Sequence, residues 1–241
     1  MRSVVGGVAA ALLAASVCVA DQPAPQSEPT TPQWMFFAGA EAWHSGAFGH
    51  GGLLWSPGGL FAEGFTLKLL AGGGTYRYRA GGPLGVDVTG TAMLSSIMPG
   101  WRFKAGKLEV TAVAGLDVQD HRLSLDDPGN RLRGTLFGVR FGVDAWYEPM
   151  ERMMLAANVS ASSVGPSFWA RLATGWHVFG MVWHGPEVQG LGGPNYQQLR
   201  VGAHVTSFRS GLFEWSAGAG FASDSDRRSG IYGRLGVLAR Y

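Results

Sequence analysis

The sequence is poor in charged residues, has a single cysteine and lacks any long apolar run. Charged residues make up only 15% of the 241 residues, which is low for a soluble protein of this length. No stretch supplies the roughly 18 consecutive apolar residues of a membrane helix, so a helical membrane protein is excluded. Cys18 is the only cysteine, which excludes a disulfide framework. The formal net charge of +2 excludes the strongly basic character of a nucleic-acid-binding protein, and we expect no nucleic-acid partner.

The N-terminus has the features of an export signal. Met1 and Arg2 supply a positive start, residues 4–13 are uncharged, and small residues precede Asp21. We therefore predict a secretory signal peptide over residues 1–20, cleaved after Ala20. Residues 21–32 are rich in proline and polar side chains and contain no aromatic residue, which predicts a disordered leader. Residues 33–241 remain as one domain.

The last segment of the chain alternates between two kinds of side chain. One face carries Ile231, Leu235 and Val237, whereas the other carries Arg234 and Arg240. Successive side chains of a strand point to opposite faces, so this segment offers an apolar face to lipid and a polar face to a lumen. A chain with 38 glycines, 12% aromatic residues and a mean hydropathy of +0.07 fits that arrangement. We predict an all-β fold, a transmembrane antiparallel up-and-down β-barrel in the bacterial outer membrane.

The same alternation recurs along the domain and predicts about 12 strands. They are expected near residues 34–44, 49–56, 61–79, 85–104, 107–121, 132–147, 151–162, 167–179, 181–189, 197–207, 211–222 and 230–241. The connections alternate between short ones, at 57–59, 105–106, 148–150, 180 and 208–210, and mostly longer polar ones, at 81–84, 121–131, 190–196 and 223–229. Short periplasmic turns and longer external loops are typical of outer-membrane barrels.

Aromatic residues at the expected strand ends support the barrel. The residues concerned are Trp34, Phe36, Tyr147, Phe213 and Tyr241. Aromatic girdles mark the two membrane interfaces of such barrels, and we expect outer-membrane lipid around this one. The alternative, a soluble β-sandwich with these rings in its core, leaves the export signal and the sorted connections unexplained.

The strand register assigns ionisable side chains of both signs to the barrel interior. They are Lys68, Asp87, Glu109, Asp117, Arg140, Asp144, Arg171, Glu187, Arg200, Glu214, Arg234 and Arg240. At about 12 strands the lumen is narrow, and two interpretations stay open. Because buried ions need partners, the charges are expected to pair into a network that plugs the interior. The second interpretation is a modest polar pore, which is favoured by inward glycines that leave space, at Gly138, Gly142, Gly202, Gly218 and Gly236.

An enzyme that modifies lipid is the main competing class. A serine or threonine hydrolase needs a nucleophile, a base and an orienting group, and the nearest candidates are His204 with Thr206 or Ser207, and His177 with Thr174. Neither pair has a recognisable signature, so we predict no catalytic residues and no cofactor. The acidic run at 126–130 lacks the carboxylate spacing of a calcium loop, and we predict no metal site.

Several blocks resemble a known family. They include HGGLLWSPGGLFAEGFTLKLLAGGGTYRYRAG, MPGWRFKAGKLEVTAVAGLDVQDHRLS, RFGVDAWYEP, RLATGW, YQQLRVGAHVTSF and EWSAGAGFASDSDRRSGIYGRLGVLARY. Together they resemble the cellulose biosynthesis protein BcsS family of alphaproteobacteria, from Trp34 to Tyr241. The resemblance implies a role beside bacterial cellulose synthesis and supplies no catalytic residues.

We therefore expect a non-enzymatic outer-membrane barrel that is accessory to cellulose biosynthesis or export, with cellulose or the cellulose synthase machinery as a partner. The alternatives are a small porin-like channel unrelated to cellulose and, with less support, a lipid-modifying enzyme. Aromatic faces stack on sugars, so external loops are expected to offer polysaccharide contacts through Tyr76, Tyr78, His121 and Tyr196.

Overall fold

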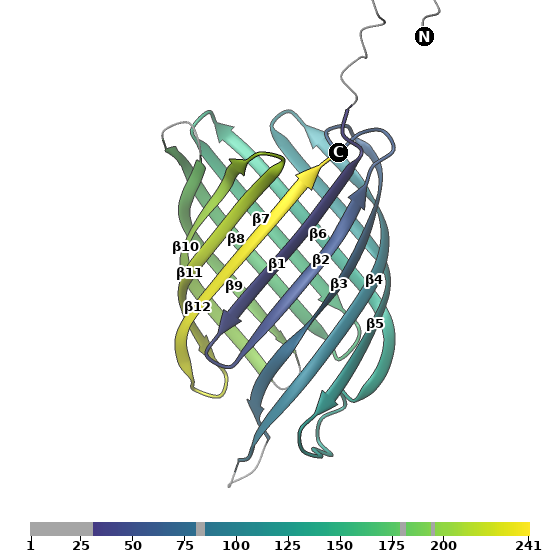
Figure 1. Ribbon diagram of the computed structural model, residues 1–241, viewed down its shortest axis with the longest axis vertical. Coiled ribbons are helices and arrows are strands. Elements are labelled where there is room, and N and C mark those ends of the chain that lie inside the picture. Colours follow the sequence, from purple (N-terminus) through teal and green to yellow (C-terminus); the bar gives the residue numbers. More distant parts are fainter. Residues whose placement is uncertain (1–30, 81–84, 179–181, 194–195) are drawn as a thin grey trace, which may run out of the picture. The chain divides into compact units, whose positions relative to one another are not determined.

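Twelve antiparallel strands form a closed barrel in the computed structural model, which describes residues 31–80, 85–178, 182–193 and 196–241 (Figure 1). The strands are β1 (Trp34–Trp43), β2 (Gly46–Trp55), β3 (Gly64–Arg79), β4 (Asp87–Ala105), β5 (Leu108–Leu123), β6 (Gly134–Met150), β7 (Met153–Ser162), β8 (Ser167–Val178), β9 (Val182–Gly193), β10 (Tyr196–Ser210), β11 (Phe213–Asp224) and β12 (Ser229–Arg240). Each strand pairs with its neighbours in the sequence, and β12 pairs with β1. The prediction of an up-and-down barrel of about 12 strands is confirmed. The predicted signal peptide, most of the leader, the connection at 81–84 and the turn at Gly180 lie outside the described residues.

The barrel is closed by the first and last strands, which meet at one end of the molecule. The backbone N–H of Trp34 donates to the carbonyl of Tyr241 at 2.9 Å, and the N–H of Tyr241 donates to the carbonyl of Trp34 at 2.8 Å. The register continues from Met35 opposite Arg240 along the whole of β1. We call this end of the barrel the terminal end and the opposite end the distal end (Figure 1).

Apolar side chains cover the outer face of the barrel. Exposure alternates along β1 and β6, and the outward Phe137, Phe221 and Ile231 are among the most exposed residues. The aromatic residues expected at strand ends, Trp34 and Tyr147 among them, also face outward. Trp34 stacks on Trp55 with ring centroids 5.8 Å apart. These rings gather at the terminal end, as an interfacial girdle requires.

Strand ends differ from the predicted ones where backbone pairing continues without the expected side-chain pattern. β9 runs to Gly193 because its glycines pair with β8 and β10 through the backbone alone. β10 continues to Ser210 past an irregularity at Ser207, whose φ is 66°. β3 begins at Gly64, later than predicted, because the buried Leu60 donates its N–H to the Pro32 carbonyl and belongs to a longer turn. The predicted sorting of connections therefore fails between β2 and β3, and it also fails between β9 and β10, where the strands leave only two residues of the long connection predicted at 190–196.

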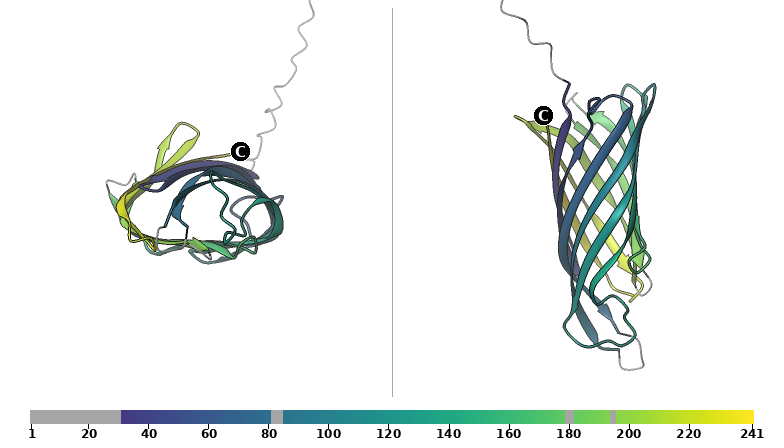
Figure 2. Two further views of the ribbon diagram at one scale, coloured as in Figure 1. Left: turned by 90° about the horizontal axis from the view of Figure 1, so that it is seen from below. Right: turned by 90° about the vertical axis from the view of Figure 1, so that its right-hand side faces the viewer.

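Three long strands extend the barrel wall at the distal end (Figures 1 and 2). β3 and β5 have 16 residues and β4 has 19, whereas β1 and β2 have 10 each. The extension contacts its neighbours, since the N–H of Arg77 donates to the Ser45 carbonyl and that of Arg79 to Asp226. The β3–β4 end is thus tied to the β1–β2 and β11–β12 connections.

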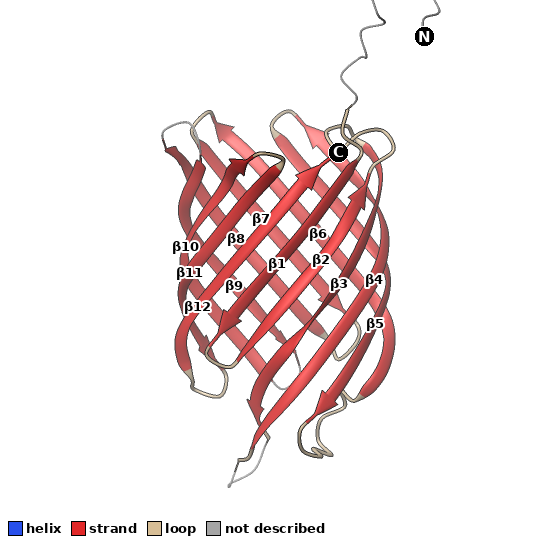
Figure 3. Ribbon diagram, viewed as in Figure 1, coloured by secondary structure: helices blue, strands red, loops and turns tan. Residues whose placement is uncertain are grey.

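Viewed along its axis, the barrel has an oval cross-section (Figure 2). Figure 3 draws the described residues as strands and the loops that connect them. In the described part of the chain, no helix has the length and apolar character needed to cross a membrane. Inside the barrel, side chains meet between strands that are three apart in the sheet, such as β3 with β6 and β10 with β1.

Candidate functional site in the barrel interior

An ion pair crosses the interior between strands that are not neighbours. Lys68 Nζ on β3 lies 2.8 Å from Asp144 Oδ2 on β6, although β4 and β5 lie between these strands in the sheet. Asn158 on β7 donates to the other carboxylate oxygen of Asp144 at 2.9 Å. Such a contact is possible only through the lumen, so all three side chains point inward.

Glu187 on β9 is the centre of a second inward cluster. Its fully buried carboxylate accepts hydrogen bonds from Arg171 at 2.8 Å and from Arg234 at 2.5 Å. Tyr232 and Gln189 donate to Oε1 at 3.0 and 3.1 Å. A buried carboxylate needs this many donors to be tolerated, because removal of a charge from water is costly. Arg171 also reaches Asn158 at 3.2 Å, which joins this cluster to the Lys68–Asp144 pair.

Arg200 on β10 joins the network to the first strand. Its guanidinium has no accessible surface, lies 2.8 Å from Glu41 Oε2 and donates to Gln198 at 2.6 Å. Its charge also lies over the rings of Trp43 and Tyr232, at 4.7 and 5.5 Å from their centroids. Cation–π contacts of this kind stabilise a desolvated guanidinium. The half of the interior between β8 and β12 is therefore filled by paired charges.

Asp117 on β5 organises a third cluster nearer the distal end. Its carboxylate accepts two hydrogen bonds from Arg140 at 3.0 Å and further ones from Ser96, Gln119 and Ser162 at 2.7, 2.7 and 2.5 Å. The carboxylate is fully buried, and each of its oxygens has more than one donor. The cluster fixes β4, β5, β6 and β7 to one another.

The remaining inward candidates lie at the terminal end. Glu109 pairs with Lys104 at 2.8 Å, and Glu214 pairs with Arg240 at 2.7 Å. Ser207 also donates to Glu214 at 3.1 Å. These groups are partly exposed, so they form a polar rim around this opening of the barrel.

Asp87 is an exception, because it does not face the lumen. It lies at the distal end of β4 on the outward register, with half of its side-chain surface exposed, and pairs with Arg228 and Arg79. The adjacent Val88 is buried on the inward side. The prediction fails because the usual alternation reverses where β3–β5 extend past the other strands. There, water replaces lipid on the outer face, and the inner face is closed by neighbouring side chains.

The four aromatic candidates for polysaccharide contact lie on strands rather than in loops. Tyr76 and Tyr78 belong to β3, His121 to β5, and Tyr196 begins β10. Tyr78 and His121 are buried, and the Tyr78 hydroxyl donates to Asp127 at 2.8 Å. Tyr76 stacks on Tyr78 at 6.2 Å. Tyr76 and Tyr196 are the two that keep partial exposure, both at the distal end.

The inward glycines do not leave open space. A Cβ at each of the five predicted positions would approach a side-chain atom within 3.0 Å, the neighbours being Ser163 at Gly138, Val113 at Gly142, Tyr232 at Gly202, Glu187 at Gly218 and Ser216 at Gly236. The glycines therefore make room for larger neighbours. The argument that they favour a pore is wrong, because empty space depends on what the facing strands supply.

The candidate hydrolase residues are engaged in other contacts. His204 is buried, and its Nδ1 lies 3.0 Å from Thr206 Oγ1 while its Nε2 lies 3.1 Å from the Thr174 carbonyl. No carboxylate takes either of these positions, so the ring lacks the orienting partner of a triad. His177 stacks on Trp183 at 4.3 Å, and strand alternation places Thr174 on the opposite face of β8. Within the described ranges no three potential metal ligands gather.

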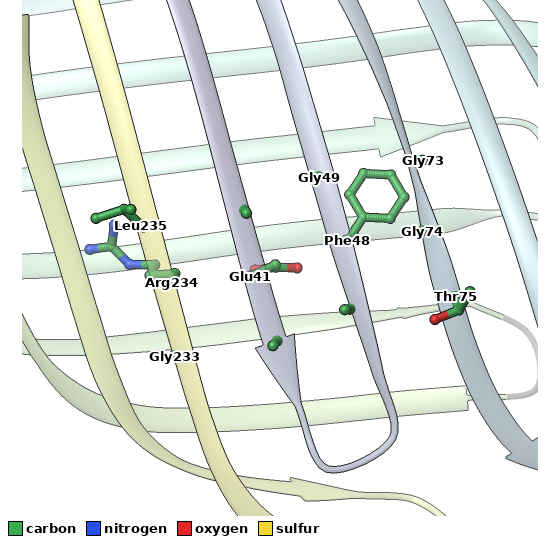
Figure 4. Close-up of a pocket in the computed structure, with 12 residues that line it drawn as sticks. Glu41, Phe48, Gly49, Gly73, Gly74, Thr75, Gly233, Arg234 and Leu235 are labelled. Carbon is green, nitrogen blue, oxygen red and sulfur yellow. The ribbon is translucent and has the colours of Figure 1, made fainter.

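A shallow groove of about 740 Å³ crosses β12, β1, β2 and β3 (Figure 4). Most of its lining is small and belongs to the outward register, such as Ala40, Ala42, Ala47 and Gly233. The groove thus lies on the lipid-facing side, apart from the interior network.

Sequence reasoning missed several interior residues that complete the network. Glu41, Gln189, Gln198 and Tyr232 all contact the predicted charges. Glu41 lies between two alanines on the inward register of β1, which is a signal that alternation alone could have supplied. Gln189, Gln198 and Tyr232 are uncharged, so the search for inward charges did not select them.

Comparisons with known proteins agree with this fold. A family model described as cellulose biosynthesis protein BcsS matches residues 35–241. No curated protein matches the chain significantly. The chain is similar to the COG4313 outer membrane channel from Pseudomonas putida F1, with 12% identity and a TM-score of 0.57 over 91% of this chain and 99% of the other. It is also similar to the translocator domain of the autotransporter NalP from Neisseria meningitidis, with 12% identity and a TM-score of 0.51 over 89% and 90%. At these identities the likeness shows a shared barrel fold.

Proposed function

The chain belongs to the cellulose biosynthesis protein BcsS family, and from this we propose that it is a non-enzymatic outer-membrane barrel accessory to cellulose biosynthesis or export. The observation that carries the proposal is the family match, which extends over nearly the whole barrel. The interior supports an accessory role rather than a conduit for polymer. Cross-lumen contacts of Glu187 and Arg200 occupy the space that a polysaccharide chain would need.

The two faces of the wall support the proposed placement in the outer membrane. The outward face is apolar and the charged groups pair inside, as expected of a barrel that crosses the outer membrane. We place the terminal end, where β1 begins and β12 ends, in the periplasm. The extended β3–β5 wall then faces outside the cell. Mature protein should stay with the outer-membrane fraction after cells are broken and washed without detergent; recovery in the aqueous fraction would contradict the placement.

The role in cellulose production is tested by deletion of the gene. Loss of an accessory barrel should change the amount, location or texture of the polymer, and the wild-type gene supplied in trans should restore it. Unaltered cellulose in the deletion strain, with the synthase still expressed, would overturn the proposal.

The proposed absence of catalysis rests on the geometry around His204, whose ring nitrogens are held by Thr206 and a backbone carbonyl. Purified protein should release no fatty acid from phospholipid or lipopolysaccharide above the background of a His204→Ala variant. Activity that disappears in this variant would identify an enzyme instead.

Contact with the polymer is proposed at the distal end, through the partly exposed Tyr76 and Tyr196. Aromatic rings present large apolar faces with a polar tip, a combination that suits sugar rings. The buried Tyr78 and His121 would support Tyr76 from behind, through the stack on Tyr78 and the edge contact with His121 at 6.5 Å.

A further inference from the structure

The interior is filled unevenly. Inward groups between β8 and β12, such as Arg200 and the Glu187 carboxylate, have no accessible surface. On the opposite wall, the Asp144 side chain keeps 42% of its surface and that of Lys68 keeps 21%, whereas the Asp117 carboxylate, nearer the distal end, is fully buried. Both residues face the lumen in the middle of the barrel, so their accessible surface belongs to the interior rather than to the outside of the protein.

The accessible region continues along β2 toward the distal end. His50 is exposed although it faces inward, beside the ring of Phe37 at 6.5 Å. Its cross-strand neighbours are Gly39 on β1 and Gly72 on β3, so the residues directly opposite it contribute no side chain over the imidazole. Interior surface that a water molecule can reach is thus present on the distal side of the Lys68–Asp144 pair.

Accessible inward groups are also present on the other side of that pair. Toward the terminal end, Lys104 and Glu109 keep about a third of their side-chain surface. The Arg240 guanidinium at the same rim is also partly exposed. From rim to middle, the wall formed by β2–β6 therefore carries partly solvated charges of both signs.

We propose that small ions and small hydrophilic solutes cross the barrel along this wall, and that Lys68 and Asp144 form the constriction that sets the charge preference of the passage. The pair joins β3 to β6 across the lumen and therefore narrows the accessible region at its middle. Charged side chains at a narrow point control which ions pass, because little water separates them from the permeating ion. This passage is independent of the role in cellulose production.

The inference is tested by current recordings in planar lipid bilayers, with protein purified from a host that lacks its major porins. The probe is KCl, first in symmetric solutions and then under a concentration gradient. Wild-type protein should give discrete conductance steps. Asp144→Asn leaves the Lys68 ammonium uncompensated and should raise the anion-to-cation permeability ratio, whereas Lys68→Gln leaves the carboxylate and should lower it; each change should be about twofold or more.

A double Lys68→Ala/Asp144→Ala variant widens the constriction and should increase the single-channel conductance. The matched control is Asp120→Asn, which removes a carboxylate from the outward register of β5 and should leave the reversal potential unchanged. Heat-modifiable migration on gels establishes that each variant is folded. Absence of steps in the wild type, or unchanged reversal potentials in both single variants, would overturn the proposal. A null result in the gene deletion would refute the cellulose role but leave these currents unaffected.

Discussion

Arg200 on β10 and Glu41 on β1 form an ion pair of 2.8 Å, although β11 and β12 separate their strands in the sheet. The guanidinium is fully buried, and it also donates to Gln198. This contact therefore bridges β1 and β10 over the inner face of β11 and β12, beside the closure of the barrel.

Arg200→Met should destabilise the barrel strongly. The substitution leaves Glu41 without its counter-charge inside the protein, and we expect the free energy of unfolding to fall by about 3–5 kcal/mol. Urea titration in lipid vesicles, followed by tryptophan fluorescence, measures the change. Arg122→Met is the control, because that side chain is 83% exposed and its loss should cost less than about 0.5 kcal/mol. Equal losses of unfolding free energy in the two variants would show that the buried ion pair stabilises the barrel no more than the exposed arginine does.

The stability cost of a charge on the outer face should depend on its depth in the membrane. Leu235 lies midway along β12 and Ile231 near its distal end, and both are exposed on the outward register. Arginine at Leu235 should cost about 2–4 kcal/mol, and arginine at Ile231 about 0–1 kcal/mol, because the cost falls toward the membrane interface. The comparison is made by reversible unfolding in vesicles. A larger cost at Ile231 would mean that the membrane boundary is placed wrongly.

A methyl group at Gly202 should disturb the interior. Its Cβ would stand 2.2 Å from the Ala219 carbonyl and 2.6 Å from the Tyr232 hydroxyl, so backbone or ring must move. Gly202→Ala is expected to cost about 1–3 kcal/mol of stability. Gly233→Ala on β12 meets no atom within 4 Å and should be close to neutral. Thermal gel-shift midpoints compare the two variants, and equal midpoints would contradict the packing argument.

Loss of the distal tyrosine rings should weaken cellulose retention on cells. Combined Tyr76→Ala and Tyr196→Ala substitution is expected to reduce cell-associated polymer while the protein level in the outer membrane stays normal. Tyr147→Ala removes the same group from the outer face at the terminal end and should leave retention unchanged. Polymer bound to cells is quantified after washing. Unchanged retention in the double variant at normal barrel levels would remove these two residues from the proposed contact.

Side-chain alternation was sufficient to predict the barrel, its strand number and the inward side chains of most strands. Lys68, Arg171 and Glu187, for example, project inward as their register indicates. Alternation separates the two faces of a strand. Apolar side chains identify the outer face only where lipid surrounds the wall. Asp87 was placed wrongly because β4 extends beyond that region, where a polar outer face is the normal one.

Contacts across the lumen could not be predicted from the sequence. The partner of Lys68 depends on the tilt of the strands and on the oval cross-section, neither of which local alternation encodes. The same limit explains why the inward glycines were wrongly expected to leave open space, since Gly218 makes room for Glu187 and Arg234 from other strands. It also explains why Tyr78 was wrongly expected in an external loop. Its inward burial results from a contact with the β5–β6 connection.

The pairing of remote chain segments has a consequence for biogenesis. Glu41 and Arg200 are 159 positions apart, and His44 and Asp224, at 2.9 Å, are 180 apart. Contacts of such large sequence separation form late and make folding slow. A nascent sheet that has not yet received β10 to β12 must hold Glu41 without Arg200, and Glu187 without Arg234, next to hydrocarbon. Insertion should therefore proceed as an all-or-none event, and assembly intermediates should be short-lived targets for periplasmic proteases.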